Sequence, residues 1–145
     1  MELSKERYKE LYGNKPKNQL GQLSESEEQK QLFQWANWKS GKYPELELLY
    51  HIPNGGLRNK AVATKLKIEG VKSGVPDICL PIARGNYNAL YIELKVVKGG
   101  CVSDNQKAWL NKLRECGNLA VVCKGFDDAK DTIINYLKLK ERVKC

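Results

Sequence analysis

The chain has 145 residues, of which 41% are hydrophobic, so it is long and apolar enough for one domain with its own core rather than a disordered chain. Lysine and arginine outnumber aspartate and glutamate by 25 to 17, and the net charge of +8 favours a polyanionic partner such as nucleic acid, with surface solubility as an equally simple explanation. No apolar run reaches the length of a membrane span or a signal peptide, so we expect no membrane contact and a cytoplasmic protein.

The N-terminal region divides into two parts by composition. Residues 1–23 are polar and basic, which predicts an arm or linker in front of a domain over residues 24–145. A helix is predicted over 24–41, because Ser24 is a suitable N-cap and an amphipathic stretch follows it.

The rest of the domain alternates between strand and helix patterns. In chain order we predict a strand at 46–52, a helix at 57–70, strands at 76–82 and 89–97, a helix at 103–117, a strand at 118–124 and a helix at 127–142. This order indicates an α/β fold with a mixed central β-sheet flanked by helices.

Three charged residues interrupt the two central strands, where burying charge is costly. Side-chain alternation places Glu93 and Lys95 on one face of their strand, and a hairpin would set Asp77 beside Glu93. Two converging carboxylates suit a hard cation such as Mg²⁺, and a neighbouring lysine can orient a water and offset charge on a phosphodiester. An ordinary ion pair on a solvated sheet face is the structural alternative.

The spacing of these residues resembles a known signature. GVPD, fifteen intervening residues and ELK match the pattern of the PD-(D/E)xK nucleases. Together with SESEEQ, IPNGG, SDNQKAWL and AVV, they resemble the VRR-Nuc (virus-type replication-repair nuclease) family over about residues 24–137. The resemblance implies a restriction-endonuclease-like core and DNA phosphodiester hydrolysis that depends on Mg²⁺ or Mn²⁺.

The same resemblance implies roles for individual residues. Asp77 and Glu93 would be metal ligands, the backbone carbonyl of Leu94 a further ligand, and Lys95 the catalytic lysine. Gln106 and a glutamate of the first helix would complete the site.

Gln106 has two readings. With Ser103 it forms S-x-x-Q at a helix start, which is a capping box and a purely structural role. It also lies one turn before Leu110 on the core-facing stripe, from which it could reach the sheet. We favour the catalytic site.

The first helix offers three acidic candidates. Ser24 and Glu27 form another capping box, which gives Glu27 a structural task. Glu28 lies four residues before Leu32 and shares its inward face, so Glu28 is the predicted catalytic carboxylate. Glu25 and Glu27 remain alternatives.

A basic surface near residues 54–72 could contact DNA phosphates, and a solvated helix face explains it equally well. Its candidates for DNA binding are Asn54, Arg58, Lys60, Lys65 and Lys72. The tryptophans are interpreted as core or oligomer-interface residues, with base stacking as the less favoured reading.

The resemblance implies a structure-specific endodeoxyribonuclease for branched DNA, because small stand-alone members of the family are similar to Holliday-junction resolvases. It also makes a phage gene in a bacterial host one origin. A compact chain with one site would need a two-fold homodimer to cut opposed strands symmetrically. A flap or nicked-end nuclease is the first alternative. A non-catalytic DNA-binding module is the second, and the conjunction of two acids and a lysine on one sheet face counts against it.

Overall fold

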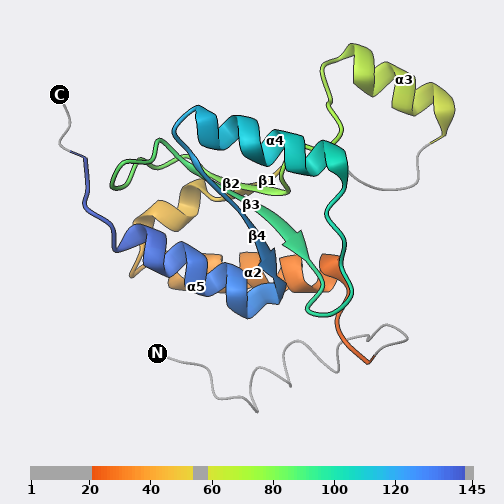
Figure 1. Cartoon of the computed structure of the whole chain (residues 1–145). Coiled ribbons are helices and arrows are strands. Elements are labelled where there is room, and N and C mark those ends of the chain that lie inside the picture. The colour runs from red at the N-terminus through yellow and green to blue at the C-terminus, as the bar shows by residue number, and fades with distance from the viewer. Residues whose placement is uncertain (1–20, 54–58, 143–145) are drawn as a thin grey trace.

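The computed structural model describes residues 21–53 and 59–142, which form a mixed sheet with helices on both faces (Figure 1). The helices are α2 (Glu25–Lys39), the 3₁₀ helix η1 (Pro44–Leu48), α3 (Lys60–Ile68), α4 (Asp104–Glu115) and α5 (Gly125–Leu137). The strands are β1 (Tyr50–His51), β2 (Ile78–Leu80), β3 (Leu90–Lys95) and β4 (Leu119–Lys124). The predicted fold class, an α/β domain with a mixed central sheet, is confirmed.

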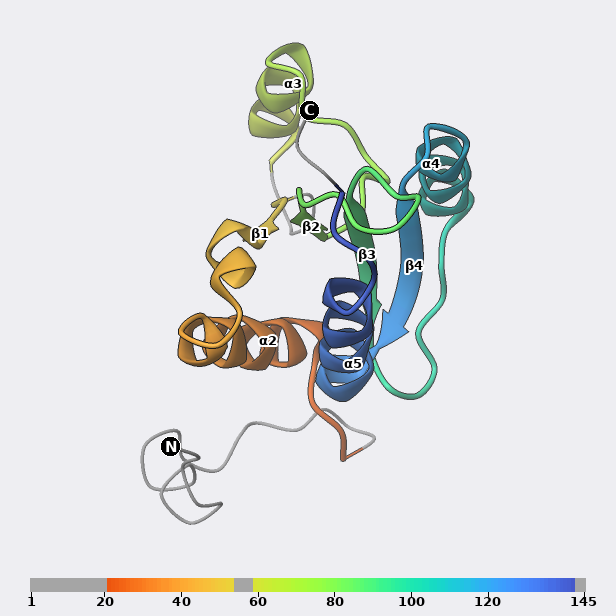
Figure 2. The ribbon, with the colours of Figure 1, turned by 90° about the vertical axis from the view of Figure 1, so that its left-hand side faces the viewer.

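The sheet has the order β1-β2-β3-β4. The pairs β1–β2 and β2–β3 are antiparallel, whereas β3 and β4 are parallel because α4 connects them as a crossover. Figure 2 shows α4 on one side of β3 and β4, with α2 and α5 on the other. One sheet face is therefore closed by two helices, whereas α4 stands alone on the opposite face.

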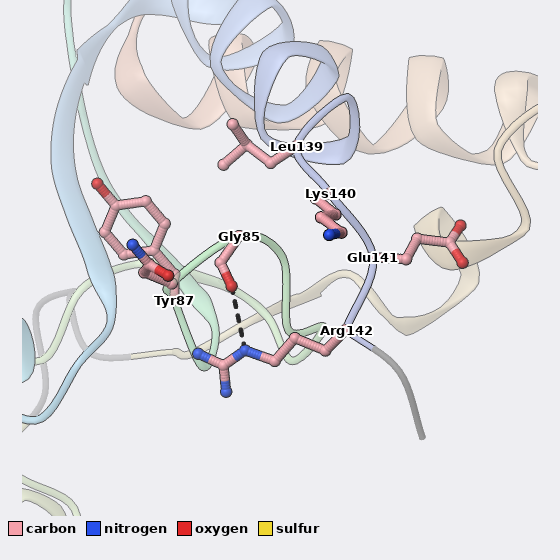
Figure 3. Close-up of a pocket in the computed structure, with 7 residues that line it drawn as sticks. Gly85, Tyr87, Leu139, Lys140, Glu141 and Arg142 are labelled. Atoms are coloured by element: carbon pink, nitrogen blue, oxygen red, sulfur yellow. Dashed lines mark hydrogen bonds between the residues drawn. The ribbon is translucent and has the colours of Figure 1, made fainter. Parts of the chain in front are cut away.

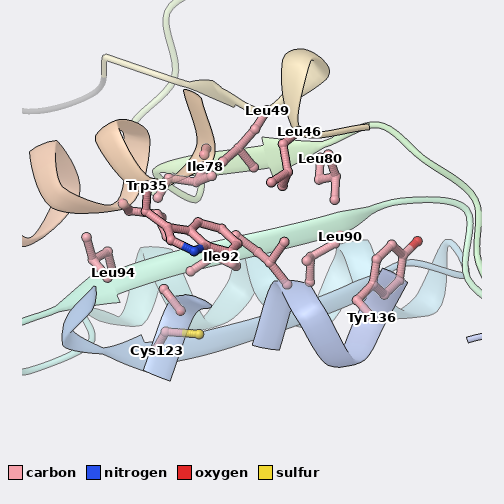
Figure 4. Packing of buried hydrophobic residues seen from close by; sticks show 14 residues of the cluster. Trp35, Leu46, Leu49, Ile78, Leu80, Leu90, Ile92, Leu94, Cys123 and Tyr136 are labelled. Carbon is pink, nitrogen blue, oxygen red and sulfur yellow. The ribbon is translucent and has the colours of Figure 1, made fainter. Parts of the chain in front are cut away.

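The main core lies between the sheet and the pair α2 and α5 (Figure 4). Alternation along β3 sends Leu90, Ile92 and Leu94 into it, where they meet Trp35 of α2 and Tyr136 of α5. The remaining side chains of β3 must then point towards the α4 face. This division of β3 puts its charged residues on the side of the sheet that the core does not occupy.

The predicted strand at 46–52 is wrong over most of its length. Residues Pro44–Leu48 form a 3₁₀ helix, and only Tyr50–His51 pair with β2. Pro44 suits the first position of a helix, and the buried Leu46 and Leu49 are three residues apart, the spacing that a 3₁₀ turn places on one side. The apolar run is thus buried by helical rather than strand periodicity.

The other predicted elements lie within a few residues of those observed, although α5 begins two residues before the predicted start and ends at Leu137. The first residues of the predicted helix 57–70 lie outside the described part. None of the residues of α3 is buried, and Ile68 is 81% exposed. Figure 1 shows α3 set apart from the layers of the sheet. In the described part of the chain, no helix has the length and apolar character to span a membrane.

Candidate active site

The two central strands bring Asp77 and Glu93 together. Ile78 pairs with Ile92 in the antiparallel ladder, and continuing this register by one residue places Asp77 opposite Glu93, with both side chains on one face. The Oδ2 atom of Asp77 accepts a hydrogen bond of 2.8 Å from the N–H of Leu94. Since β2 begins only at Ile78, the N–H of Leu94 bonds to the Asp77 carboxylate where a residue of a longer strand would otherwise accept it. This hydrogen bond fixes the direction of the carboxylate.

Glu93 is the most unusual residue of the site, because it is a carboxylate with only 1% of its surface exposed. Its Oε1 atom accepts a hydrogen bond of 2.6 Å from Gln106 Nε2 and lies 3.2 Å from Lys95 Nζ. Its Oε2 atom is buried and has no hydrogen-bond partner among the described residues. Burial, reinforced by the charge of Asp77, raises the pKa of Glu93 to about 7 although Lys95 opposes the shift.

Lys95 is also buried, with 8% of its surface exposed. Its ammonium lies 3.2 Å from Glu93 Oε1 and 3.6 Å from Glu25 Oε1. Burial alone would lower the pKa of Lys95, but the hydrogen bond to Glu93 and the charges of Glu25, Glu93 and Asp77 outweigh it and raise the pKa above its usual value. Lys95 is therefore a fixed cation next to two carboxylates.

Gln106 completes the capping box of α4 and also contacts Glu93. Its Oε1 atom accepts the N–H of Ser103 at 2.8 Å and its own N–H donates to Ser103 Oγ, which completes the capping box of α4. Its Nε2 atom donates to Glu93. The capping box thus holds the amide in the orientation from which it reaches the sheet.

The three acids of α2 occupy different environments. Glu27 Oε1 pairs with Lys30, and the N–H of Glu27 donates to the N-cap Ser24. The carboxylate of the buried Glu28 accepts the N–H of Phe126 at 2.7 Å, at the start of α5. Glu25, by contrast, reaches Lys95. The catalytic role predicted for Glu28 stays a prediction, but Glu25 is the acid of this helix that contacts the site.

A further contact was not visible in the sequence pattern. His51 Nδ1 lies 2.9 Å from the backbone carbonyl of Asp77, which also accepts the N–H of Ile52. His51 lies outside the quoted motifs and Ile52 is only the first residue of IPNGG, so the pairing of β1 with β2 is what brings them to Asp77. This pairing fixes the backbone of Asp77 from the side opposite to Leu94.

The three predicted DNA-binding residues that the structure describes do not lie in the carboxylate site itself. Asn54 and Arg58 fall outside the described residues. Lys60 and Lys65 lie on the exposed helix α3, where Lys65 is 3.8 Å from Glu69. Lys72, which follows α3, lines a groove beside α4.

A separate pocket of about 630 Å³ lies at the hairpin between β2 and β3 (Figure 3). It is lined by Gly85, Tyr87 and the segment that follows α5, and Arg142 Nε donates to the carbonyl of Gly85 at 3.2 Å. None of the carboxylates of the candidate site lines this pocket. Its contacts attach the C-terminal segment to the hairpin.

The mixed sheet and its flanking helices are consistent with an α/β nuclease core. The model of the VRR-NUC domain family matches residues 3–127, so the chain belongs to this nuclease family, which confirms the resemblance. Among solved structures, a VRR_NUC domain protein is similar to the chain with 34% identity and a TM-score of 0.71, over 82% of this chain and 92% of that one. Comparison with the curated proteins gives no match.

Proposed function

We propose that the protein is a Mg²⁺- or Mn²⁺-dependent endonuclease that hydrolyses phosphodiester bonds in branched DNA. The observation that supports this most is Glu93, a buried carboxylate with one unpartnered oxygen, beside Asp77 and Lys95. An ordinary ion pair on a solvated sheet face does not account for this arrangement, because Asp77 and Glu93 around the one buried Lys95 leave negative charge uncompensated. Such an arrangement is costly for stability and is characteristic of functional sites.

The donor atoms fit a hard divalent cation. Asp77 and Glu93 supply carboxylate oxygens, and in an extended strand the carbonyl of Leu94 points to the same edge as its N–H, which is the side of Asp77. Over the described ranges no group of three His, Cys, Asp or Glu side chains is arranged as a metal site. A small set of protein ligands suits Mg²⁺, which keeps several waters. When bound, Mg²⁺ or Mn²⁺ would supply a Lewis acid and lower the pKa of a bound water.

The protein side chains around that position have separate tasks in this proposal. The Lys95 ammonium orients the attacking water and offsets the negative charge that develops on the phosphate. Gln106 holds the Glu93 carboxylate through the 2.6 Å hydrogen bond, and Glu25 holds Lys95 from the solvent side. Glu25 therefore takes the place of the helix carboxylate, and Glu28 positions α2 against α5.

Branched DNA is proposed as the substrate because of the family and of the net charge of +8. A four-way junction cut by a homodimer is the first candidate, since one site per chain needs a two-fold partner to cut opposed strands. A flap or nicked-end substrate is the second, and it uses the same residues.

The experiment is a cleavage panel with labelled linear, flap and four-way DNAs, each with Mg²⁺, Mn²⁺ or EDTA. Wild-type protein should cleave a branched substrate only with metal. Asp77→Asn should abolish cleavage but keep DNA binding, because an amide oxygen can still accept the N–H of Leu94. The exposed Asp131 on α5 provides the matched control Asp131→Asn, which should cleave normally. Cleavage in EDTA, or full activity of Asp77→Asn, would refute the proposal.

A further inference from the structure

A groove of about 480 Å³ runs along one flank of α4, outside the carboxylate site. Its apolar lining comes from Ala108, Trp109 and Leu113 of α4, and its basic lining from Lys72 and Lys112. The other flank of α4 has a separate lining that includes Val122 of β4. Because the first groove contains Lys72, from the segment that enters β2, it lies on the β2 side of α4.

The lining of this groove combines an aromatic ring with positive charge. Trp109 is half-buried and does not belong to the main core cluster, so its ring is not explained by core packing. Among the described residues that line the groove there are two lysines and no carboxylate. An aromatic face between ammonium groups matches the chemistry of a nucleotide, whose base can stack and whose phosphate is anionic.

The groove lies next to the candidate active site, because the segment that carries Lys72 packs on the first turn of α4. Asn105, in the first turn of α4, donates from Nδ2 to Ser73 Oγ at 2.7 Å. Gly74 has a φ of +86°, and a Cβ atom there would lie 2.9 Å from the backbone of Asn105. The glycine therefore lets the segment that carries Lys72 pack directly on α4.

The next residue of α4 belongs to the active site. Gln106 donates to Glu93, and Trp109 follows it by three residues, which is about 4.5 Å along the helix axis. The groove consequently begins within about one helical turn of the residues proposed to act on the phosphate. A DNA strand that enters the site could continue into it.

We propose that this groove binds unpaired nucleotides of the substrate, with a base stacked on Trp109 and the backbone phosphates at Lys72 and Lys112. This inference rests on the proposed function for its choice of nucleic acid. In a duplex the faces of the bases are stacked on each other, so only an unpaired segment can offer one to Trp109. Of the two candidate substrates proposed above, a flap carries such a segment in itself, whereas a four-way junction would supply one only where its branch point is unpaired.

The test measures binding in EDTA, so it does not depend on cleavage. A fluorescent duplex with an oligothymidine tail and the same duplex with blunt ends are titrated with wild type, Trp109→Ala and Trp38→Ala. Trp38 is 44% exposed on α2 and serves as the matched control. Trp109→Ala should weaken binding of the tailed duplex about tenfold, the range for loss of a stacked base, and leave the blunt duplex and the Trp38→Ala curves unchanged.

A second variant tests the phosphate contacts. The double substitution of Lys72 and Lys112 by alanine should reduce the salt slope of tailed-duplex binding by about 1.4, from about 0.7 for each phosphate contact on a single strand. Lys138→Ala, at the exposed end of α5, should not change the slope. If a thermal melt shows that Trp109→Ala is unfolded, the lysine variant decides the question alone.

Three results would overturn the inference. The first is equal loss of tailed and blunt binding, and the second is no loss for either variant. The third is poly-glutamate binding that depends on Trp109 as strongly as DNA binding does, which would assign the groove to an acidic peptide. Failure of the proposed nuclease chemistry would appear only in the cleavage panel, so the two failures are distinguishable.

Discussion

The contact between Glu28 and α5 allows a quantitative prediction of how much stability a substitution of Glu28 costs. Phe126 is the second residue of α5, and its N–H has no partner within the helix. The N-cap Lys124 makes no side-chain cap, and the Glu28 carboxylate, 98 residues away in sequence, accepts the Phe126 N–H instead. We expect Glu28→Gln to keep a neutral acceptor but lose the charge at the positive end of the helix, at a cost of about 1 kcal/mol.

Removing the acceptor should cost more. Glu28→Leu leaves the Phe126 N–H without a partner in a buried place, so we expect a loss of about 3 kcal/mol. For a chain of this size each kcal/mol lowers the Tm by roughly 4 °C. Glu27→Gln is the matched control, because the Glu27 pair with the exposed Lys30 should contribute less than about 0.5 kcal/mol.

The assays are urea and thermal unfolding of these variants, followed by single-turnover cleavage well below each Tm. Glu28→Gln should cleave at nearly the wild-type rate, whereas Glu25→Gln should keep wild-type stability and cleave more slowly because Lys95 loses its second carboxylate. A stable but inactive Glu28→Gln, together with an active Glu25→Gln, would refute this reasoning. It would restore Glu28 as the catalytic acid.

Three further predictions concern the site and its assembly. Gln106→Ala should slow cleavage about tenfold or more, because Glu93 loses its 2.6 Å donor, and Tm should fall through loss of the capping box; unchanged kinetics would argue against this role. Because the pKa of Glu93 is raised, the folded, metal-free protein holds a proton that the unfolded chain releases, so the free energy of unfolding should fall as pH rises from about 4.5 to about 7. Glu93→Gln should remove this pH dependence, and identical pH profiles of the two proteins would contradict the prediction. Light scattering should show a homodimer at micromolar concentration, and a strict monomer without junction preference in competition binding would favour the flap or nicked-end substrate.

The sequence was sufficient to predict which side chains of β3 enter the core and which lie on the opposite face. Alternation along β3 separates Leu90, Ile92 and Leu94 from Glu93 and Lys95, and the structure has this division. The position of Gln106 could also be predicted, because a capping box fixes it at a helix start. These features depend on local patterns, namely strand alternation and helix capping, which can be read directly from the sequence.

The rest depends on contacts between distant segments. Whether Glu25 or Glu28 faces Lys95 is decided by how α2 packs on α5, and inward periodicity alone favoured Glu28. The start of α5 could not be found from its own residues, because the acceptor for the Phe126 N–H is Glu28 of α2. The strand predicted at 46–52 failed because an apolar run of this length fits a 3₁₀ turn as well as a strand.

The central claim is that Lys95 acts in phosphodiester hydrolysis, and one comparison tests it most directly. Single-turnover cleavage of a branched DNA with Mn²⁺ should be abolished in Lys95→Ala, while DNA binding and the circular dichroism spectrum stay as in wild type. The matched control is Lys98→Ala, three residues further along and exposed, which should cleave normally. Wild-type cleavage by a purified, folded Lys95→Ala would contradict the assignment of this cluster as the active site.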